Sequence, residues 1–359
     1  MPLGIEFAMA TISLAAVRRV VDDTTLLDDV SLQVAQGELL VVVGPSGSGK
    51  TSLIRAVAGL DEITSGSVFF DDEDVTKVKV ADRDIGIVFQ ANTLFPTHTA
   101  GANVGFPLRI RGMRRDVINK RINAEARSLG IEHVLDRWPR QLSAGHAQLV
   151  QIARAMVRVP SVLLLDEPMA HLDTPTRHRL REELRELQRG YGVTTIYATN
   201  DPSEAVYMAD RIAAIEHGKL QQVGTPEELY RSPGNVHIAW LTGPVSFVEA
   251  TVEPDSDGYW LVGDGFRIRA WATELGRHRG ETVRLGIRPE GIRLMPDSGL
   301  RATVDSRSFE SGAPVTRLRL GGRLVAMALL DLPVGSDVGV NIDHCLVFDS
   351  ADRLVAEVG

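Results

Sequence analysis

The feature that most constrains this chain is an eight-residue, glycine-rich segment, Gly-Pro-Ser-Gly-Ser-Gly-Lys-Thr, at residues 44–51. It follows a short, largely apolar run at residues 37–43 and precedes residues 52–59, which have the composition of a helix that ends at a glycine. A continuous apolar run rich in β-branched residues is typical of a strand buried on both faces of a parallel sheet. Strand, glycine-rich loop and helix in this order predict a loop that binds phosphate groups.

The expected ligand of this loop is ATP with Mg²⁺. Successive backbone N–H groups point into one concavity at a helix N-terminus, and both features favour phosphate. Lys50 is expected to reach the β- and γ-phosphates, and the Thr51 hydroxyl is expected to bind magnesium. A chance glycine-serine turn before a Lys-Thr pair is the alternative, which the flanking strand and helix disfavour. The residues expected to contact the nucleotide here are Gly44, Pro45, Ser46, Gly47, Ser48, Gly49, Lys50, Thr51 and Ser52.

A second chemical element is the pair Asp166-Glu167, which directly follows the apolar run at residues 162–165. A strand at this run would carry Asp166 to the rim of the sheet beside the phosphate loop, where its carboxylate can hold magnesium. Glu167 would then be placed to act as the general base that polarises the attacking water. Such a pair is weak evidence alone and strong evidence downstream of a phosphate-binding loop.

The remaining pattern predicts two domains of different class. A third apolar run at residues 193–198, with a helix predicted from about residue 175 to 189 before it, indicates an α/β sheet covered by helices. Helical spacing predicts a mainly helical insert at about residues 91–145. After about residue 235, residues 266–271 alternate with period two, and Gly321-Gly322 is a hairpin signal. We therefore expect a small antiparallel β domain, barrel-like, at the C-terminal end.

Composition restricts the class of partner and compartment. The formal net charge of −8 makes free nucleic acid an unfavourable main partner. The single cysteine, Cys345, excludes a disulfide within the chain and fits a reducing cytoplasm. The sequence has no apolar run of about 18 residues. Residues 1–8 lack the basic start and the apolar stretch of a secretion signal, and we interpret them as a lead-in before Met9.

Over nearly its whole length, the chain resembles the ATP-binding subunit of ATP-binding cassette (ABC) transporters. The resemblance implies a nucleotide-binding domain at residues 9–235 and a C-terminal regulatory β domain of the OB-like (TOBE) type at residues 236–359. The matching segments are residues 82–90, which end at the Q-loop glutamine Gln90; 142–146, at the place of the signature sequence, with 152–155 after it; 170–173, similar to the D-loop; 224–230, similar to the end of an importer's nucleotide-binding domain; and 286–292, similar to a motif of MalK-type carbohydrate importers.

The resemblance also implies a mechanism. Two nucleotide-binding subunits, expected to be a homodimer, would close head to tail over two ATP molecules. Ser143 and Gly145 would donate hydrogen bonds to the γ-phosphate of the ATP held by the other subunit, and Gln90 would contact the magnesium ion and the attacking water. Transmembrane permease subunits would contact the helical insert at the cytoplasmic face of the membrane. A substrate-binding protein would act indirectly, through these permease subunits.

Four positions depart from the family pattern. Ala144 and His146 replace a glycine and the glutamine of the signature sequence. Because Ser143 and Gly145 remain, we expect a weakened but usable signature, and we interpret both changes as neutral. Asn200 stands at the switch position, where the family has histidine. Its amide can hydrogen-bond a phosphate but cannot carry a proton, so stabilisation of developing charge should weaken. Val21 stands where an aromatic ring would stack on adenine, and offers only apolar contact.

Several alternatives remain open at this point. Carbohydrate is the expected cargo, whereas residues 240–245 lean towards the related sulfate importers, so sulfate or another small solute is the rival. A weakly active regulatory subunit paired with a more active homologue is supported by Asn200 and opposed by Lys50, Asp166 and Glu167. A non-transport ABC ATPase, acting in translation or DNA repair, usually carries two fused cassettes or a long coiled-coil insertion, and this sequence has one phosphate loop and no such insertion.

Overall fold

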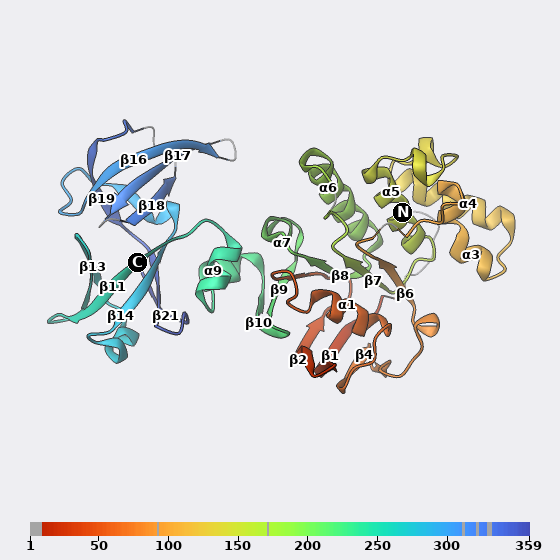
Figure 1. Ribbon diagram of the computed structural model, residues 1–359, viewed down its shortest axis with the longest axis horizontal. Helices are drawn as coiled ribbons and strands as arrows, with labels where there is room; N and C mark the ends of the chain where they lie inside the picture. The colour runs from red at the N-terminus through yellow and green to blue at the C-terminus, as the bar shows by residue number, and fades with distance from the viewer. Residues whose placement is uncertain (1–8, 92, 171, 311–312, 321–322, 329–331) are drawn as a thin grey trace. The chain divides into compact units, whose positions relative to one another are not determined.

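The computed structural model describes residues 9–91, 93–170, 172–310, 313–320, 323–328 and 332–359. The chain divides into two compact units, Met1–Pro226 and Glu227–Gly359, which Figure 1 shows in red to green and in green to blue. Two short helices, α8 (Pro226–Arg231) and α9 (Val236–Thr242), precede the strands of the second unit. The domain boundary predicted after residue 235 falls between these two helices.

The centre of the first unit is a six-stranded sheet in the order β10-β9-β3-β8-β7-β6. Strands β9, β3, β8, β7 and β6 are parallel, and β10 pairs antiparallel with β9. Every residue of β3, β7 and β8 is buried, which explains their continuous apolar runs. The strands are β3 (Leu39–Val43), β6 (Ile85–Val88), β7 (Val162–Asp166), β8 (Thr194–Thr199), β9 (Arg211–Glu216) and β10 (Lys219–Gly224).

A smaller antiparallel sheet, in the order β2-β1-β4-β5, lies on one side of this sheet, with helix α1 (Lys50–Ala58) packed between them. One hydrophobic core joins the three layers and contains Val17 of β1, Leu53 of α1 and Val42 of β3. The core therefore fixes α1, and with it the start of the helix, against the end of β3. The four strands are β1 (Ile12–Val21), β2 (Thr24–Val34), β4 (Ser65–Phe70) and β5 (Glu73–Asp74).

Helices cover the opposite side of the large sheet and form the insert (Figure 1). Asp173 caps the N-terminus of α6, and Gly192 ends it with a φ of 64°, in the left-handed region that favours glycine. The predicted insert contains α2, α3 and α4. The helices are α2 (Ala100–Val104), α3 (Phe106–Ile110), α4 (Arg115–Ser128), α5 (Ala144–Met156), α6 (Thr174–Tyr191) and α7 (Pro202–Met208), with 3-10 turns η1 (Val80–Asp82), η2 (Glu132–Val134) and η3 (Pro139–Gln141).

The second unit contains two antiparallel sheets, in the orders β13-β12-β11-β14-β20-β21 and β15-β19-β16-β17-β18, around one hydrophobic core. Strands β17 and β18 pair as expected, and the predicted turn Gly321-Gly322 lies outside the described residues. The elements are β11 (Ser246–Pro254), β12 (Tyr259–Gly263), β13 (Phe266–Ala270), η4 (Thr273–His278), β14 (Thr282–Ile287), η5 (Pro289–Gly291), β15 (Ile292–Leu294), β16 (Arg301–Glu310), β17 (Ala313–Leu320), β18 (Arg323–Ala328), β19 (Asp337–Ile342), β20 (Cys345–Phe348) and β21 (Leu354–Val358). The predicted fold class, a phosphate-loop α/β domain followed by a small antiparallel β domain, is confirmed.

Candidate ATP-binding site

The predicted phosphate loop joins β3 to α1 in a conformation that needs its glycines. Gly47 and Gly49 have φ values of 79° and 108°, which L side chains rarely adopt. A Cβ on Gly44 would lie 2.1 Å from the backbone oxygen of Ile215, so no larger residue fits there. Ser48 is buried, and its Oγ has no hydrogen-bond partner among the described residues. Since the first four N–H groups of α1 also lack partners within the helix, the loop presents several donors to one anion.

Lys50 is the first residue of α1 and is almost entirely buried. Its Nζ donates hydrogen bonds to the backbone oxygens of Gly44 and Pro45, each at 2.9 Å. The same Nζ lies 3.5 Å from Oε1 of Glu167. The ammonium group is therefore held within the loop and reaches the strand that carries the predicted general base.

Thr51 and Asp166 form the part of the site where magnesium is expected. Thr51 Oγ1 donates to Asp166 Oδ1 at 3.1 Å, and Asp166 is the buried last residue of β7. Burial raises the pKa of Asp166, and the hydrogen bond from Thr51 acts in the opposite direction. A hydroxyl and a carboxylate are the oxygen ligands that Mg²⁺ prefers, and it usually takes only one or two carboxylates, with phosphates and water completing the shell. Among the described residues, no group of three or more His, Cys, Asp or Glu side chains is placed to hold a metal ion. Thr51 and Asp166 fit Mg²⁺ that is bound together with a phosphate ligand.

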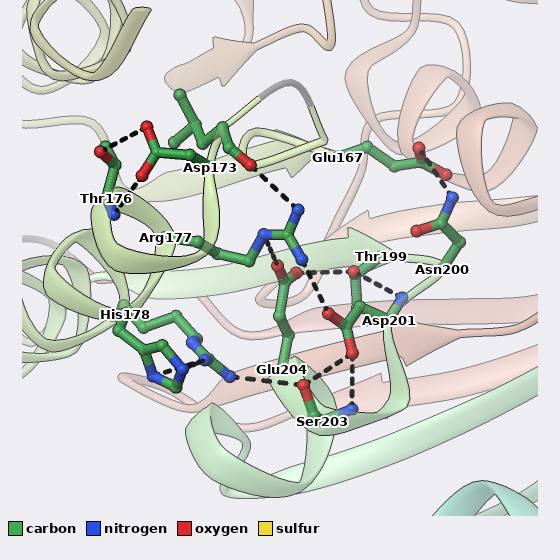
Figure 2. Close-up of polar contacts among 12 residues, drawn as sticks. Glu167, Asp173, Thr176, Arg177, His178, Thr199, Asn200, Asp201, Ser203 and Glu204 are labelled. Carbon is green, nitrogen blue, oxygen red and sulfur yellow. Dashed lines mark hydrogen bonds and ion pairs between the residues drawn. The ribbon is translucent and has the colours of Figure 1, made fainter.

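Glu167 is the point at which the other predicted residues meet. Gln90 Nε2 donates to its Oε2 at 3.3 Å, and Asn200 Nδ2 donates to the same oxygen at 3.5 Å, the contact seen at the right of Figure 2. The backbone of Glu167 has a φ of 44°, and its N–H donates to the oxygen of Ala198 at 2.9 Å. The structure thus brings Lys50, Gln90 and Asn200 together around one carboxylate, although Gln90 and Asn200 are 110 residues apart (200 − 90).

An arginine that the sequence analysis missed connects two loops next to this carboxylate (Figure 2). Arg177 lies in the first turn of α6 and donates to the backbone oxygen of Leu172 at 3.1 Å and to Asp201 Oδ2 at 3.3 Å. Leu172 belongs to the segment that resembles the D-loop, whose residue His171 lies outside the described residues. Asp201 follows the switch residue Asn200 directly. Arg177 therefore ties the D-loop segment to the switch segment.

Glu204 also stabilises the switch segment, through contacts with Thr199 and Arg177. It is 3% exposed, and its Oε2 accepts hydrogen bonds from Tyr197 Oη at 2.7 Å and Thr199 Oγ1 at 2.6 Å. Its Oε1 lies 3.8 Å from Nε of Arg177, which supplies the opposite charge. A cavity of about 100 Å³ lies beside these groups and is bordered by Glu167, Ala170, Arg177, Thr199, Asn200, Asp201 and Glu204. The switch segment is thus anchored by the buried Glu204 and the half-buried, oppositely charged Arg177.

The signature residues lie at the start of a different helix. Ser143 is the N-cap of α5, and its Oγ accepts from the backbone N–H of His146 at 3.2 Å. Gly145 is buried, and a Cβ there would lie 2.7 Å from Cγ2 of Thr176. Within the part of the chain that the structure describes, neither residue hydrogen-bonds the chain's own phosphate loop.

Val21 is the last residue of β1 and is 39% exposed. Arg19, two positions earlier, donates from Nη1 to Ser52 Oγ at 3.5 Å, and its Nη2 lies 3.0 Å from Asp61 Oδ2. Arg19 was also missed by sequence analysis, because no local pattern indicates that β1 ends beside α1. This link holds the end of β1, and hence Val21, next to the helix that carries Lys50 and Thr51.

The site combines a glycine-rich loop after the buried strand β3, a lysine and a threonine at the end of that loop, and an acidic pair at the end of β7, a parallel strand of the same sheet. These features define the class of P-loop nucleoside triphosphatases. The family model described as ABC transporter matches residues 27–170. The trehalose/maltose import ATP-binding protein MalK of Thermococcus litoralis is 39% identical over 336 residues, which cover 88% of this chain and 89% of that protein. The sn-glycerol-3-phosphate import ATP-binding protein UgpC of Ruegeria pomeroyi is 41% identical over 293 residues, 81% of each chain.

A solved structure supports the same assignment. The dimeric structure of an ATP-binding cassette in a post-hydrolysis state, bound to ADP and Pi, is similar at a TM-score of 0.54 and 29% identity, over 60% of this chain and 98% of that one. This chain belongs to the ABC transporter family as one of its ATP-binding, ATP-hydrolysing proteins. The predicted family and ATPase class are thereby confirmed. In the described part of the chain, no helix has the length and apolar character needed to cross a membrane.

Proposed function

We propose that this chain is the energy-coupling ATPase subunit of an ABC importer and that it works as a head-to-tail dimer on membrane permease subunits. The observation that carries the proposal is the meeting of Lys50, Gln90 and Asn200 on Glu167, beside the phosphate loop. These are the groups that hydrolysis of a bound nucleoside triphosphate needs: a phosphate ligand, two orienting amides and a base. The names of the similar proteins, which describe import of solutes, support the importer class.

In this proposal, residues 44–52 wrap the phosphates of ATP and Lys50 reaches the β- and γ-phosphates. Thr51, Asp166 and Gln90 would hold Mg²⁺, which supplies neutralisation of phosphate charge when it is bound. The lysine has two fixed backbone acceptors, Gly44 and Pro45, so its ammonium group is oriented before the nucleotide arrives. Val21 would contact the base through its exposed apolar surface.

Glu167 would take a proton from the attacking water as general base. The amides of Gln90 and Asn200 donate to Oε2 and thus fix the direction of the carboxylate. Asn200 supplies a hydrogen bond but no positive charge, so we expect slow turnover. Arg177, Asp201 and Glu204 hold the segment that carries Asn200.

Ser143 and Gly145 would serve the ATP of a second subunit, because neither hydrogen-bonds the phosphate loop of its own chain. The dimeric state of the similar solved cassette supports this arrangement, which we expect to be a homodimer. The helical insert would contact the permease at the cytoplasmic face of the membrane, and a substrate-binding protein would contribute indirectly. Carbohydrate is the proposed cargo; a small anionic solute is the second candidate, since one similar protein is named for sn-glycerol-3-phosphate.

The test uses the full chain with Glu167→Gln, which keeps the phosphate loop and removes the base. We expect this variant to bind Mg-ATP, to lose hydrolysis, and to form an ATP-dependent dimer visible by analytical ultracentrifugation. Glu62→Gln, a change at an exposed glutamate, is the matched control and should hydrolyse ATP as the parent does. A Glu167→Gln chain that stays monomeric and nucleotide-free at millimolar Mg-ATP would contradict the proposal.

A further inference from the structure

His146, which stands in place of the signature glutamine, hydrogen-bonds the signature serine. Its Nδ1 lies 2.9 Å from Ser143 Oγ, and its backbone N–H donates to the same oxygen at 3.2 Å. Ser143 is exposed, and as N-cap of the 13-residue helix α5 it lies where the helix dipole favours an anion. The substitution therefore acts directly on the group that is proposed to contact the γ-phosphate.

Charged and titratable groups from η2, from the loop that follows it and from α6 face this imidazole. The ring of His133, from η2, lies edge-on at 5.1 Å between centroids, and Arg137 and Arg179 contribute positive charge from the loop after η2 and from α6. Desolvation, followed by His133, Arg179 and Arg137, lowers the pKa of His146 below its usual value. These surroundings favour the neutral form of the imidazole.

The presence of a proton on Nδ1 of His146 decides where the hydroxyl proton of Ser143 points. The neutral Nε2–H tautomer lacks this proton, and the imidazolium always carries it. The oxygen of Ser143 already accepts one hydrogen bond, from the backbone N–H of His146. When Nδ1 carries no proton it can only accept, so it takes the single hydroxyl proton of Ser143. When Nδ1 carries a proton it donates, Ser143 Oγ accepts twice, and the hydroxyl proton becomes available to a phosphate oxygen.

We propose that His146 is a positioning residue that controls whether Ser143 can donate to the γ-phosphate of ATP bound to the second subunit, so that ATP-driven dimer closure takes up a proton at His146. The inference rests on the proposed function. A phosphate group close to α5 stabilises the imidazolium and offsets the neighbouring positive groups. The signature glutamine of the family has no such coupling, because a carboxamide donates and accepts at every physiological pH.

The first test measures ATP-driven dimerisation of the full chain in the Glu167→Gln background, with and without His146→Gln. With His146 present, the dissociation constant of the ATP-bound dimer should be roughly tenfold lower at about pH 6 than at about pH 8. The reason is that one hydrogen bond is gained at each of the two ATP sites. In His146→Gln the change should be less than about twofold, and this variant also corrects for the titration of ATP itself. An equal pH dependence in the two chains would overturn the inference.

The second test needs no dimer. Nuclear magnetic resonance of ring-labelled histidines follows the titration of His146 in the full chain without nucleotide, with His278 of the second unit as an internal reference. In Ser143→Ala, both forms of the ring lose their hydrogen bond to Oγ. The bond donated by the charged imidazolium is the stronger of the two, so the pKa of His146 should fall. An unchanged titration would refute the link between His146 and Ser143. Absence of an ATP-dependent dimer at every pH would instead refute the proposed function.

Discussion

Replacement of Arg177 by leucine tests whether the switch segment is held by buried charge. The side chain is 27% exposed and makes three polar contacts, to the Leu172 carbonyl, to Asp201 and, at 3.8 Å, to Glu204. The backbone contact is worth about 1 kcal/mol and the charged contact about 1.5–3 kcal/mol. The buried Glu204 carboxylate would also lose its opposite charge. Because Arg177 is partly in contact with solvent, we take about 3 kcal/mol as the total loss of stability.

The assay is differential scanning calorimetry of the full chain. The transition of the first unit is the one that Mg-ATP raises, since a ligand that binds the native state stabilises that state. A loss of about 3 kcal/mol should lower this transition by roughly 6–12 °C. Arg179→Leu is the matched control on the same helix. Arg179 is 60% exposed and forms a surface ion pair with Glu183, so its loss should cost less than about 1 kcal/mol.

A double variant separates the lost charge from the lost packing. Glu204→Gln keeps an oxygen that can accept from Tyr197 and Thr199 and removes the buried negative charge. Combined with Arg177→Leu, it should recover at least about 1 kcal/mol relative to the sum of the two single effects. Additive losses, or equal melting temperatures for Arg177→Leu and Arg179→Leu, would refute the reasoning.

Two other predictions concern Asn200 and Glu125. Asn200→His should raise steady-state ATP hydrolysis by roughly tenfold or more without changing ATP affinity, because it restores a group that can carry positive charge; an unchanged rate would contradict this. Buried Glu125 has a pKa raised to about 7, so the folded state holds a proton that the unfolded state loses above about pH 4.5. Stability should therefore fall by up to about 3 kcal/mol between about pH 4.5 and 7. The melting temperature of Glu125→Gln should not show this fall with pH. An equal dependence of melting temperature on pH in the parent and the variant would refute the prediction.

The sequence was most informative where function depends on local order along the chain. The phosphate loop and the pair Asp166-Glu167 could be assigned because each directly follows a largely apolar run, and such runs mark buried parallel strands. The contacts of Arg19 with Ser52 and of Arg177 with Asp201 span 33 and 24 residues, and no local pattern specifies them. They depend on which helix turn faces which strand end, which only the packed structure determines.

His146 is the opposite case, because its partner is only three residues away. A serine at an N-cap accepts hydrogen bonds from the first turn of its helix. The sequence could therefore have predicted that the side chain of His146, the third residue of α5, lies close enough to contact Ser143. We interpreted this substitution as neutral, since residue type alone does not show the rotamer of the ring. The structure shows the ring nitrogen bound to Ser143. We propose that this contact affects ATP binding, and the His146→Gln experiment tests that proposal.

The choice between a slow ATPase and a regulatory subunit depends on what Asn200 has lost. Its amide still donates to Glu167, and the segment that carries it is anchored through Asp201 and Glu204. The side chain of Asn200 therefore keeps its place beside Glu167 and lacks only the positive charge that a histidine could carry. Loss of one charge-stabilising group typically costs about 10²–10³ in rate, which leaves measurable catalysis when the base and the phosphate ligands are in place. A homodimer with slow turnover, accelerated by Asn200→His with a new pH dependence near the pKa of histidine, would establish the slow enzyme; an Asn200→His homodimer that remained inactive would favour the regulatory subunit.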